Sequence, residues 1–180
     1  MTNPAGGCIG VSTADCIPVL LYDEEHHAVA AIHAGWRGTL ARIVHKTIQE
    51  MAFTYHTNPK KLKAVIGPGI SIDSFEVGDE VYEAFEQAAF PMEEIAEQRP
   101  NAAFSADPAE RERLAAEGNI VQPLKWHLNL PLCNKQILLH CGVAEENIQD
   151  CGICTFQHSD EFFSARKLGT ESGRIYTAIL

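Results

Sequence analysis

Short apolar runs separated by polar turns dominate the first third of the chain, a pattern typical of β-strands. Residues 19–22 and 28–32 flank the charged segment 23–27 and predict the two strands of an antiparallel hairpin. The same kind of pattern predicts further strands at residues 8–12, 62–66, 150–154 and 175–180.

Apolar residues recur at helical spacing in residues 39–51, 77–90 and 131–141, and Thr39 is the predicted N-cap of the first of these helices. Residues 107–118 are charged and also favour a helix, whereas residues 91–106 indicate a loop. Strands and helices interleave without a strict βαβ rhythm. We therefore expect an α/β (α+β) fold of mixed β-sheet layers covered by helices, in a single domain of 180 residues.

The overall charge narrows the range of partners. The chain has 24 acidic against 14 basic residues and a formal net charge of −10, which disfavours sequence-independent binding to nucleic acid. Its apolar runs are all shorter than the roughly 18 residues that a membrane-spanning helix needs. The first ten residues lack the basic and apolar regions of a signal peptide, so we expect a cytoplasmic protein without a membrane partner.

The cysteines are interpreted as free, buried thiols and not as a disulfide framework, because nothing in the sequence indicates secretion. The pair Cys151 and Cys154 has the spacing of a zinc-ribbon or redox motif, but a second such pair is missing, so we interpret both as small apolar residues. The six cysteines are Cys8, Cys16, Cys133, Cys141, Cys151 and Cys154.

Candidate chemistry gathers at the two ends of the predicted hairpin. Cys16 precedes its first strand and His33 follows its second, and antiparallel pairing brings these two positions to the same edge. A thiolate and an imidazole suit zinc or copper, and they equally suit a Cys–His catalytic dyad. Asp15 beside Cys16 adds a carboxylate, which makes a purely structural role for this segment less favourable.

Three arginines, Arg37, Arg166 and Arg174, are candidates for binding an anion, because guanidinium binds phosphate through two hydrogen bonds. Arg37 and Arg174 each lie beside a glycine, and Arg166 lies three residues after Phe163. The predicted helix start after Arg37 would offer further donors close to His33. His127 and His158 are further candidates to line a cleft, and the glycines of residues 67–69 would let a ligand approach the backbone.

Several of these segments resemble one family. Residues 13–21 (TADCIPVLL) and 33–39 (HAGWRGT) resemble the signature motifs of the multicopper polyphenol oxidase, laccase-domain or YfiH-like family, whose members act as purine nucleoside phosphorylases. Further similar motifs follow in the family's order over about 160 residues, which is far more specific than any single motif. They are residues 66–70 (IGPGI), 75–78 (FEVG), 154–155 (CT), 162–166 (FFSAR) and 172–174 (SGR).

The resemblance implies the fold shared by YfiH-like proteins and the catalytic domain of cytotoxic necrotizing factors. It also implies phosphorolysis of adenosine and inosine, with methylthioadenosine phosphorolysis, adenosine deamination and copper-dependent phenol oxidation as further activities. The expected substrates are a purine nucleoside and phosphate. We assign Cys16, His33 and Arg37 as catalytic, Cys16 and His33 as ligands of zinc or, alternatively, copper, and Arg37, Arg166 and Arg174 as phosphate-binding.

The chain also departs from the family pattern. Family members are longer and carry, ahead of the Ala-Asp-Cys motif, a histidine in a Gln-Val-His context that completes the metal site. The chain resembles the carboxy-terminal two thirds of the family, so we expect an amino-terminally incomplete domain with impaired catalysis and an exposed sheet edge that favours a homo-oligomer. Asn129 stands where the family commonly has an acid.

Two other hypotheses remain open. A cysteine hydrolase or amidase would use Cys16 as nucleophile and His33 as base, an arrangement similar to the deamidating domain of cytotoxic necrotizing factors. Alternatively, the chain is an inactive fragment or a subunit that needs a second chain to complete its site. Metal content discriminates the hydrolase from the phosphorylase.

Overall fold

The computed structural model describes residues 1–3, 6–101, 103–104, 107–116, 118, 121–169 and 171–180. At its centre lies a four-stranded sheet in the order β3-β2-β4-β8. The predicted hairpin is confirmed, with β2 and β3 antiparallel and Pro18 opposite His33. The strands are β2 (Ile17–Asp23), β3 (Ala28–Ala34), β4 (Lys63–Ile66) and β8 (Ile148–Asp150).

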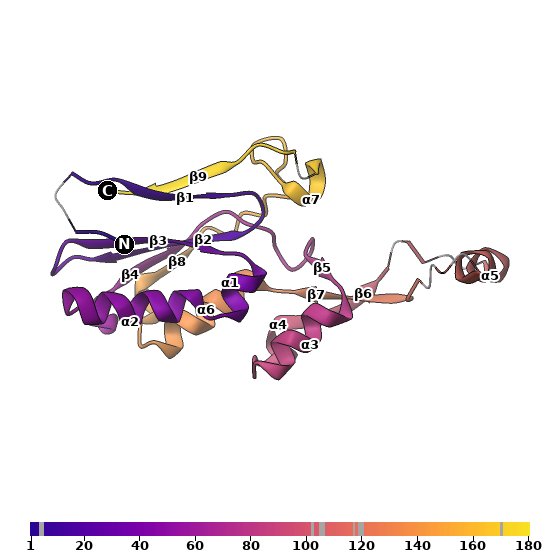
Figure 1. The fold of residues 1–180 in the computed structure, drawn as a ribbon, viewed down its shortest axis with the longest axis horizontal. Coiled ribbons are helices and arrows are strands. Elements are labelled where there is room, and N and C mark those ends of the chain that lie inside the picture. The colour runs from indigo at the N-terminus through magenta and orange to yellow at the C-terminus, as the bar shows by residue number, and fades with distance from the viewer. Residues whose placement is uncertain (4–5, 102, 105–106, 117, 119–120, 170) are drawn as a thin grey trace.

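Two strands from the ends of the chain form a second sheet over the first. The strands β1 (Ile9–Thr13) and β9 (Ile175–Ile179) pair antiparallel, with Val11 opposite Thr177. In Figure 1 this ribbon of indigo and yellow strands lies on one face of the central sheet, and helices cover the opposite face. The expected mixed sheet layers covered by helices are therefore present.

The helical layer consists mainly of α2 (Ile43–Tyr55) and α6 (Leu130–His140). Buried side chains of both helices, including Ile48 and Leu138, pack with Leu21 and Ile66 of the central sheet in one apolar core. Because this close-packed core lies between the helices and the central sheet, the strands are rigid and the residues at their ends have fixed positions. Short helices accompany this layer: α1 (Trp36–Leu40), η1 (Pro59–Lys61) and η2 (Glu145–Asn147).

A third sheet, in the order β5-β7-β6, extends to one side of the central layers (Figure 1). Tyr82 of α3 stacks on Trp126 of β7 with ring centroids 3.9 Å apart, which joins a helix to this sheet. The helix α5 lies beyond the far end of β6 and β7 and has no buried residue. The elements are β5 (Glu76–Val77), α3 (Asp79–Gln87), α4 (Met92–Ile95), β6 (Ala96–Pro100), α5 (Pro108–Ala116) and β7 (Leu124–Leu128).

The helix predicted over residues 39–51 is wrong at its start, because the chain forms two helices with a break between them. Arg42 at the break has a left-handed backbone (φ 53°), and its guanidinium donates to the carbonyl of Ala88 and lies over the ring of Phe90. Thr39 is not an N-cap but lies buried inside α1, where its hydroxyl donates to the carbonyl of Ala34.

Two further predictions need correction. Residues 91–106 hold α4 and β6 where we predicted a loop, although residues 102 and 105–106 lie outside the described part. The strand predicted at 150–154 is instead β8, which begins at Ile148 and pairs in parallel with β4. Helices α3, α5 and α6 and strands β1, β4 and β9 match their predictions to within a few residues, except that residue 117 lies outside the described part.

The cysteine prediction is only partly right. All six thiols are free, but Cys133 and Cys154 alone are buried, whereas Cys8 and Cys151 are exposed. Among the described residues, no helix is long and apolar enough to cross a membrane.

Candidate functional site

The structure brings Cys16 and His33 together at one end of the central sheet. Cys16 directly precedes β2, and His33 lies near the end of the antiparallel neighbour β3. Both side chains lie close to the backbone of Gly35. A Cβ atom on Gly35 would lie 2.7 Å from Cys16 Sγ and 3.7 Å from His33 Nε2. The thiol and the imidazole therefore border the same small space.

Gly35 keeps this space open. Its backbone is extended (φ −68°), a conformation that any residue adopts, so the glycine is not needed for the turn. It is needed because a side chain would occupy the position next to the Cys16 thiol. Glycine at a site of close approach is a common device for admitting a ligand or a neighbouring group.

Asp15 connects this edge to two later motifs of the chain. Its buried carboxylate accepts hydrogen bonds from the Thr155 hydroxyl and from the Arg166 backbone N–H, both at 2.7 Å. Its backbone is left-handed (φ 77°), which aspartate tolerates better than most residues. Asp15 therefore fixes the loop that carries Cys16, and the conformation turns the carboxylate toward the carboxy-terminal segments.

The glycine turn after β4 packs against the same loop. The Ile70 N–H donates to the Asp15 carbonyl, and the Thr155 N–H donates to the Gly69 carbonyl. A Cβ on Gly69 would overlap Ile17. The expectation that these glycines admit a ligand needs correction here, because what approaches Gly69 is the protein's own strand. Three motifs of the sequence thus meet around Asp15.

The two cysteines near this junction have pKa values shifted in opposite directions. Burial and the negative charge of Asp15 raise the pKa of Cys16, against a smaller opposing effect of Arg174. Burial would also raise the pKa of Cys154, but hydrogen bonds, among them those with Ser71 and Ser74, outweigh it and lower that pKa. Cys154 is thus part of a hydrogen-bonded junction and not simply a small apolar residue.

The three candidate arginines occupy different settings, and all three are exposed. Arg166 follows the N-cap Ser164 of α7 (Ala165–Leu168), and its guanidinium donates to the Glu76 carbonyl. Arg174 bonds to the carbonyls of its own turn, and its charge is close enough to Cys16 to lower that thiol's pKa. Arg37 lies in α1 with its guanidinium 4.1 Å from the Trp36 ring centre.

The two candidate histidines differ. His127 is buried, and its Nδ1 donates to the Ile72 carbonyl at 2.7 Å, because a carbonyl oxygen only accepts. It holds the chain segment that follows the glycine turn. His158 is exposed in the turn after Thr155. A hollow of about 580 Å³ reaches His33 from the side of α2, but Cys16 is not among the residues that line it.

The donor set fits a metal ion in part. Cys16 and His33 are donors that zinc and copper accept, and both border the space beside Gly35. In the described part of the chain, no group of three or more His, Cys, Asp or Glu residues is placed to hold a metal. Neither His127 nor His158 therefore joins Cys16 and His33 in such a group.

Sequence reasoning assigned no role to Gly35 and Thr155, and Asp15 was noticed only as an unfavourable core residue. Gly35 has a sequence signal, since it follows a candidate ligand at a strand end. For Thr155 the only signal is its place in the family-like motif of residues 154–155, which does not reveal its partner Asp15, 140 positions away.

Known proteins match nearly the whole chain. The chain is 42% identical over 180 residues to a purine nucleoside phosphorylase of Bacteroides thetaiotaomicron, covering 100% of this chain and 59% of the relative. It is 38% identical over 179 residues to "Adenosine deaminase RL5" of an unknown prokaryote, covering 99% of this chain and 60% of that protein. The chain thus spans about three fifths of these relatives.

Solved structures show the same fold. The hypothetical protein YfiH of Bacillus licheniformis superposes with a TM-score of 0.75 at 25% identity, over 95% of this chain and 56% of that one. YlmD of Geobacillus stearothermophilus superposes with a TM-score of 0.76 at 24% identity, over 98% and 57%. The family model described as multi-copper polyphenol oxidoreductase laccase matches residues 1–180, and the chain therefore belongs to that family.

Proposed function

We propose that the chain carries the reaction centre of a purine nucleoside phosphorylase, which cleaves the N-glycosidic bond of adenosine or inosine with phosphate. The observation that carries this proposal is the meeting of Cys16 and His33 at Gly35, next to a loop bonded to the segment that bears Arg166. The names of the relatives support the reaction class. The chain spans only part of the length of these relatives, so the proposed activity refers to a protein that includes the remaining part as well.

Phosphorolysis needs an anion site and a means of stabilising charge on the departing purine. Arg174, whose charge acts at Cys16, and Arg37, which follows Gly35 in α1, would bind and orient phosphate through charge-assisted hydrogen bonds. Cys16 and His33 would hold zinc or copper, which when bound acts as a Lewis acid on an oxygen or nitrogen of the substrate. Asp15 would act indirectly, by fixing the loop that positions Cys16.

The direct test is formation of ribose 1-phosphate from inosine. We would assay the chain alone and the chain completed by the part of the Bacteroides relative that lies outside the matched region. We expect product only in the presence of phosphate, and more from the completed protein.

Arg174→Ala should raise the phosphate concentration needed for half-maximal activity about 10-fold or more, which corresponds to a lost charged hydrogen bond. Arg113→Ala in α5 serves as the matched control and should leave that concentration unchanged. Phosphate-independent release of hypoxanthine from the completed protein would contradict the proposal.

A second candidate activity is adenosine deamination, which is supported by the relative that bears that name at 38% identity. It would use the same pair, Cys16 and His33. Conversion of adenosine to inosine without phosphate would reveal it. The cysteine hydrolase hypothesis predicts activity without any metal, so full activity after treatment with a chelator would favour it instead.

A further inference from the structure

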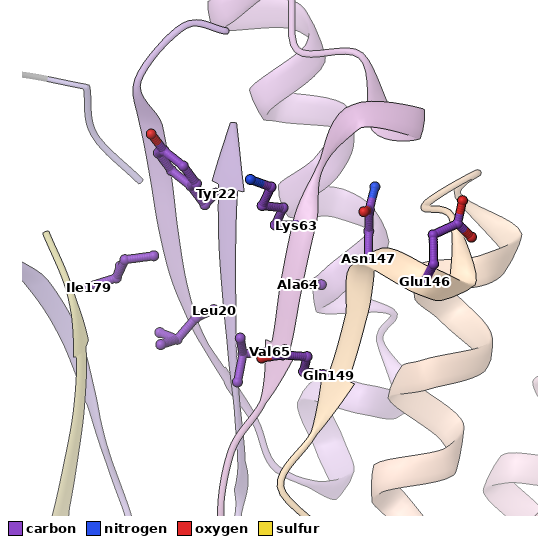
Figure 2. Close-up of a pocket in the computed structure, with 9 residues that line it drawn as sticks. All are labelled: Leu20, Tyr22, Lys63, Ala64, Val65, Glu146, Asn147, Gln149 and Ile179. Atoms are coloured by element: carbon purple, nitrogen blue, oxygen red, sulfur yellow. The ribbon is translucent and has the colours of Figure 1, made fainter. Parts of the chain in front are cut away.

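Polar side chains have different surroundings on the two faces of the central sheet. Figure 2 shows a groove of about 420 Å³ on the face toward β9, where the amide of Gln149 is exposed. Water can satisfy that amide, so it needs no protein partner. Helices cover the opposite face (Figure 1), and Asn134 of α6 is completely buried in that layer. A buried amide has to find its hydrogen-bond partners inside the protein.

Hydrogen bonds connect Asn134 to the turn beside Cys16. The Asn134 Nδ2 donates to the Leu130 carbonyl at 2.9 Å and to the hydroxyl oxygen of Thr39, also completely buried, at 3.1 Å. The Thr39 hydroxyl in turn donates to the Ala34 carbonyl at 3.3 Å. Because the Leu130 carbonyl only accepts, the amide nitrogen has to face it, and this fixes the direction of each bond.

The turn held by Thr39 borders the space between Cys16 and His33. Ala34, which accepts from the Thr39 hydroxyl, follows His33 directly at the end of β3. Gly35, which keeps that space open, accepts at its carbonyl from the Thr39 N–H at 2.8 Å. Thr39 therefore holds two successive carbonyls of the turn, one through its hydroxyl and the other through its backbone.

The amide of Asn134 is only partly satisfied. Its Oδ1 atom is buried and has no hydrogen-bond partner in the described part of the chain. A buried acceptor without a donor destabilises a fold, and an apolar side chain of similar shape would suit the core better. Stability alone therefore does not account for an amide at this position, whereas the donor that it supplies to Thr39 does.

We infer that Asn134 acts through Thr39 as a positioning residue, by fixing the turn after β3. The site that it positions is the pair Cys16 and His33, and the inference rests on the function proposed for that pair. Without the amide, the Thr39 hydroxyl is free to rotate away from the turn, and Gly35 can move relative to the Cys16 thiol. Groups that hold metal ligands in place affect binding without touching the ion.

The first test measures how fast iodoacetamide alkylates Cys16 in the metal-free full chain, by mass spectrometry of the peptide that contains it. We expect Asn134→Leu and Thr39→Val to raise this rate about 3-fold or more, because the turn beside the thiol opens more often. Leucine and valine keep the branching of the residues that they replace. Thr39→Ser keeps the hydroxyl and should leave the rate unchanged. Ile137→Ala, the control, creates a cavity in the same helix and should lower stability without raising the rate.

Stability and zinc affinity separate positioning from a merely structural role. In urea unfolding, we expect Asn134→Leu to be as stable as the wild-type chain or more stable, because it removes the unsatisfied acceptor. Zinc affinity, measured by competition with a chromophoric chelator, should nevertheless fall about 10-fold in Asn134→Leu and in Thr39→Val. In a Thr39→Val background, Asn134→Leu should have no further effect on alkylation, because both changes act on one turn.

Three results would overturn the inference. They are an alkylation rate that neither Asn134→Leu nor Thr39→Val changes, an equal increase in Ile137→Ala, and additive effects in the double variant. A wild-type chain that binds no zinc would contradict only the proposed function, because alkylation is measured without metal.

Discussion

At the scale of single residues, the site depends on a few positions whose neighbours are distant in the sequence. A side chain at Gly35 would come too close to the Cys16 thiol. The Asp15 carboxylate accepts hydrogen bonds from the Thr155 hydroxyl and from the Arg166 N–H. The types and spacing of Cys16 and His33 were sufficient to predict their meeting, because hairpin pairing follows from local sequence. The partners of Asp15 could not be predicted, since they depend on how the carboxy-terminal segments pack.

Gly35→Ala tests whether the space between Cys16 and His33 is functional. The added methyl group would lie 2.7 Å from Cys16 Sγ, so the thiol has to rotate away. We expect weaker zinc binding by competition titration with a chromophoric chelator and little change in thermal stability, because the backbone of Gly35 suits alanine. In a Cys16→Ser background the same change should have no additional effect. A separate loss there would show that Gly35 acts elsewhere.

Asp15→Ala should destabilise the protein by about 3 kcal/mol, because two hydrogen bonds to a buried carboxylate are lost. Asp15→Asn should cost less, about 1 to 2 kcal/mol, since asparagine also tolerates the left-handed backbone and keeps an acceptor oxygen. Urea unfolding measures both. Equal losses for the two variants would mean that the hydrogen bonds from Thr155 and Arg166 contribute little.

At the scale of secondary-structure elements, local patterns predict most strands and helices, and long-range contacts explain the errors. The break between α1 and α2 depends on Arg42 reaching Ala88, 46 positions away, and no local pattern indicates it. Likewise, β8 is defined by parallel pairing with β4, which places Ala64 opposite Ile148. Such pairing has no local signal because parallel strands are joined by long crossovers.

Asn129 provides a test at the start of α6. It is the N-cap, and its side-chain oxygen accepts from the Leu132 N–H at 3.0 Å. Asparagine and aspartate are about equally good N-caps. Asn129 therefore caps α6 as well as the acid expected from the family resemblance would.

We expect Asn129→Ala to lower stability by about 1 kcal/mol, through loss of that hydrogen bond. Asn129→Asp should leave stability unchanged or raise it by about 0.5 kcal/mol, because a negative charge is favourable at a helix N-terminus. Thermal unfolding followed by circular dichroism distinguishes the two. Destabilisation by aspartate would indicate that another acidic group opposes a charge at this position.

At the scale of the whole molecule, the layers assemble the site from motifs spread over the entire chain. The hairpin supplies Cys16 and His33, and the turn after β4 and the segment at Thr155 pack against Asp15. The helix α7 contributes the Arg166 N–H that donates to the Asp15 carboxylate. The family resemblance predicted that these motifs belong together, and the structure shows the contacts that join them.

We propose that Cys16 and His33 bind one metal ion, and the electronic spectrum of the cobalt-substituted protein tests this coordination. Cobalt(II) replaces zinc in sites of this kind, and a bound thiolate adds a charge-transfer band in the near ultraviolet. We predict that band in the wild-type chain, its loss in Cys16→Ser, and a changed visible spectrum with weaker binding in His33→Ala. His158→Ala is the matched control and should leave the spectrum unchanged. A spectrum without a thiolate band, or one that both Cys16→Ser and His33→Ala leave intact, would show that these two residues do not share a metal ion.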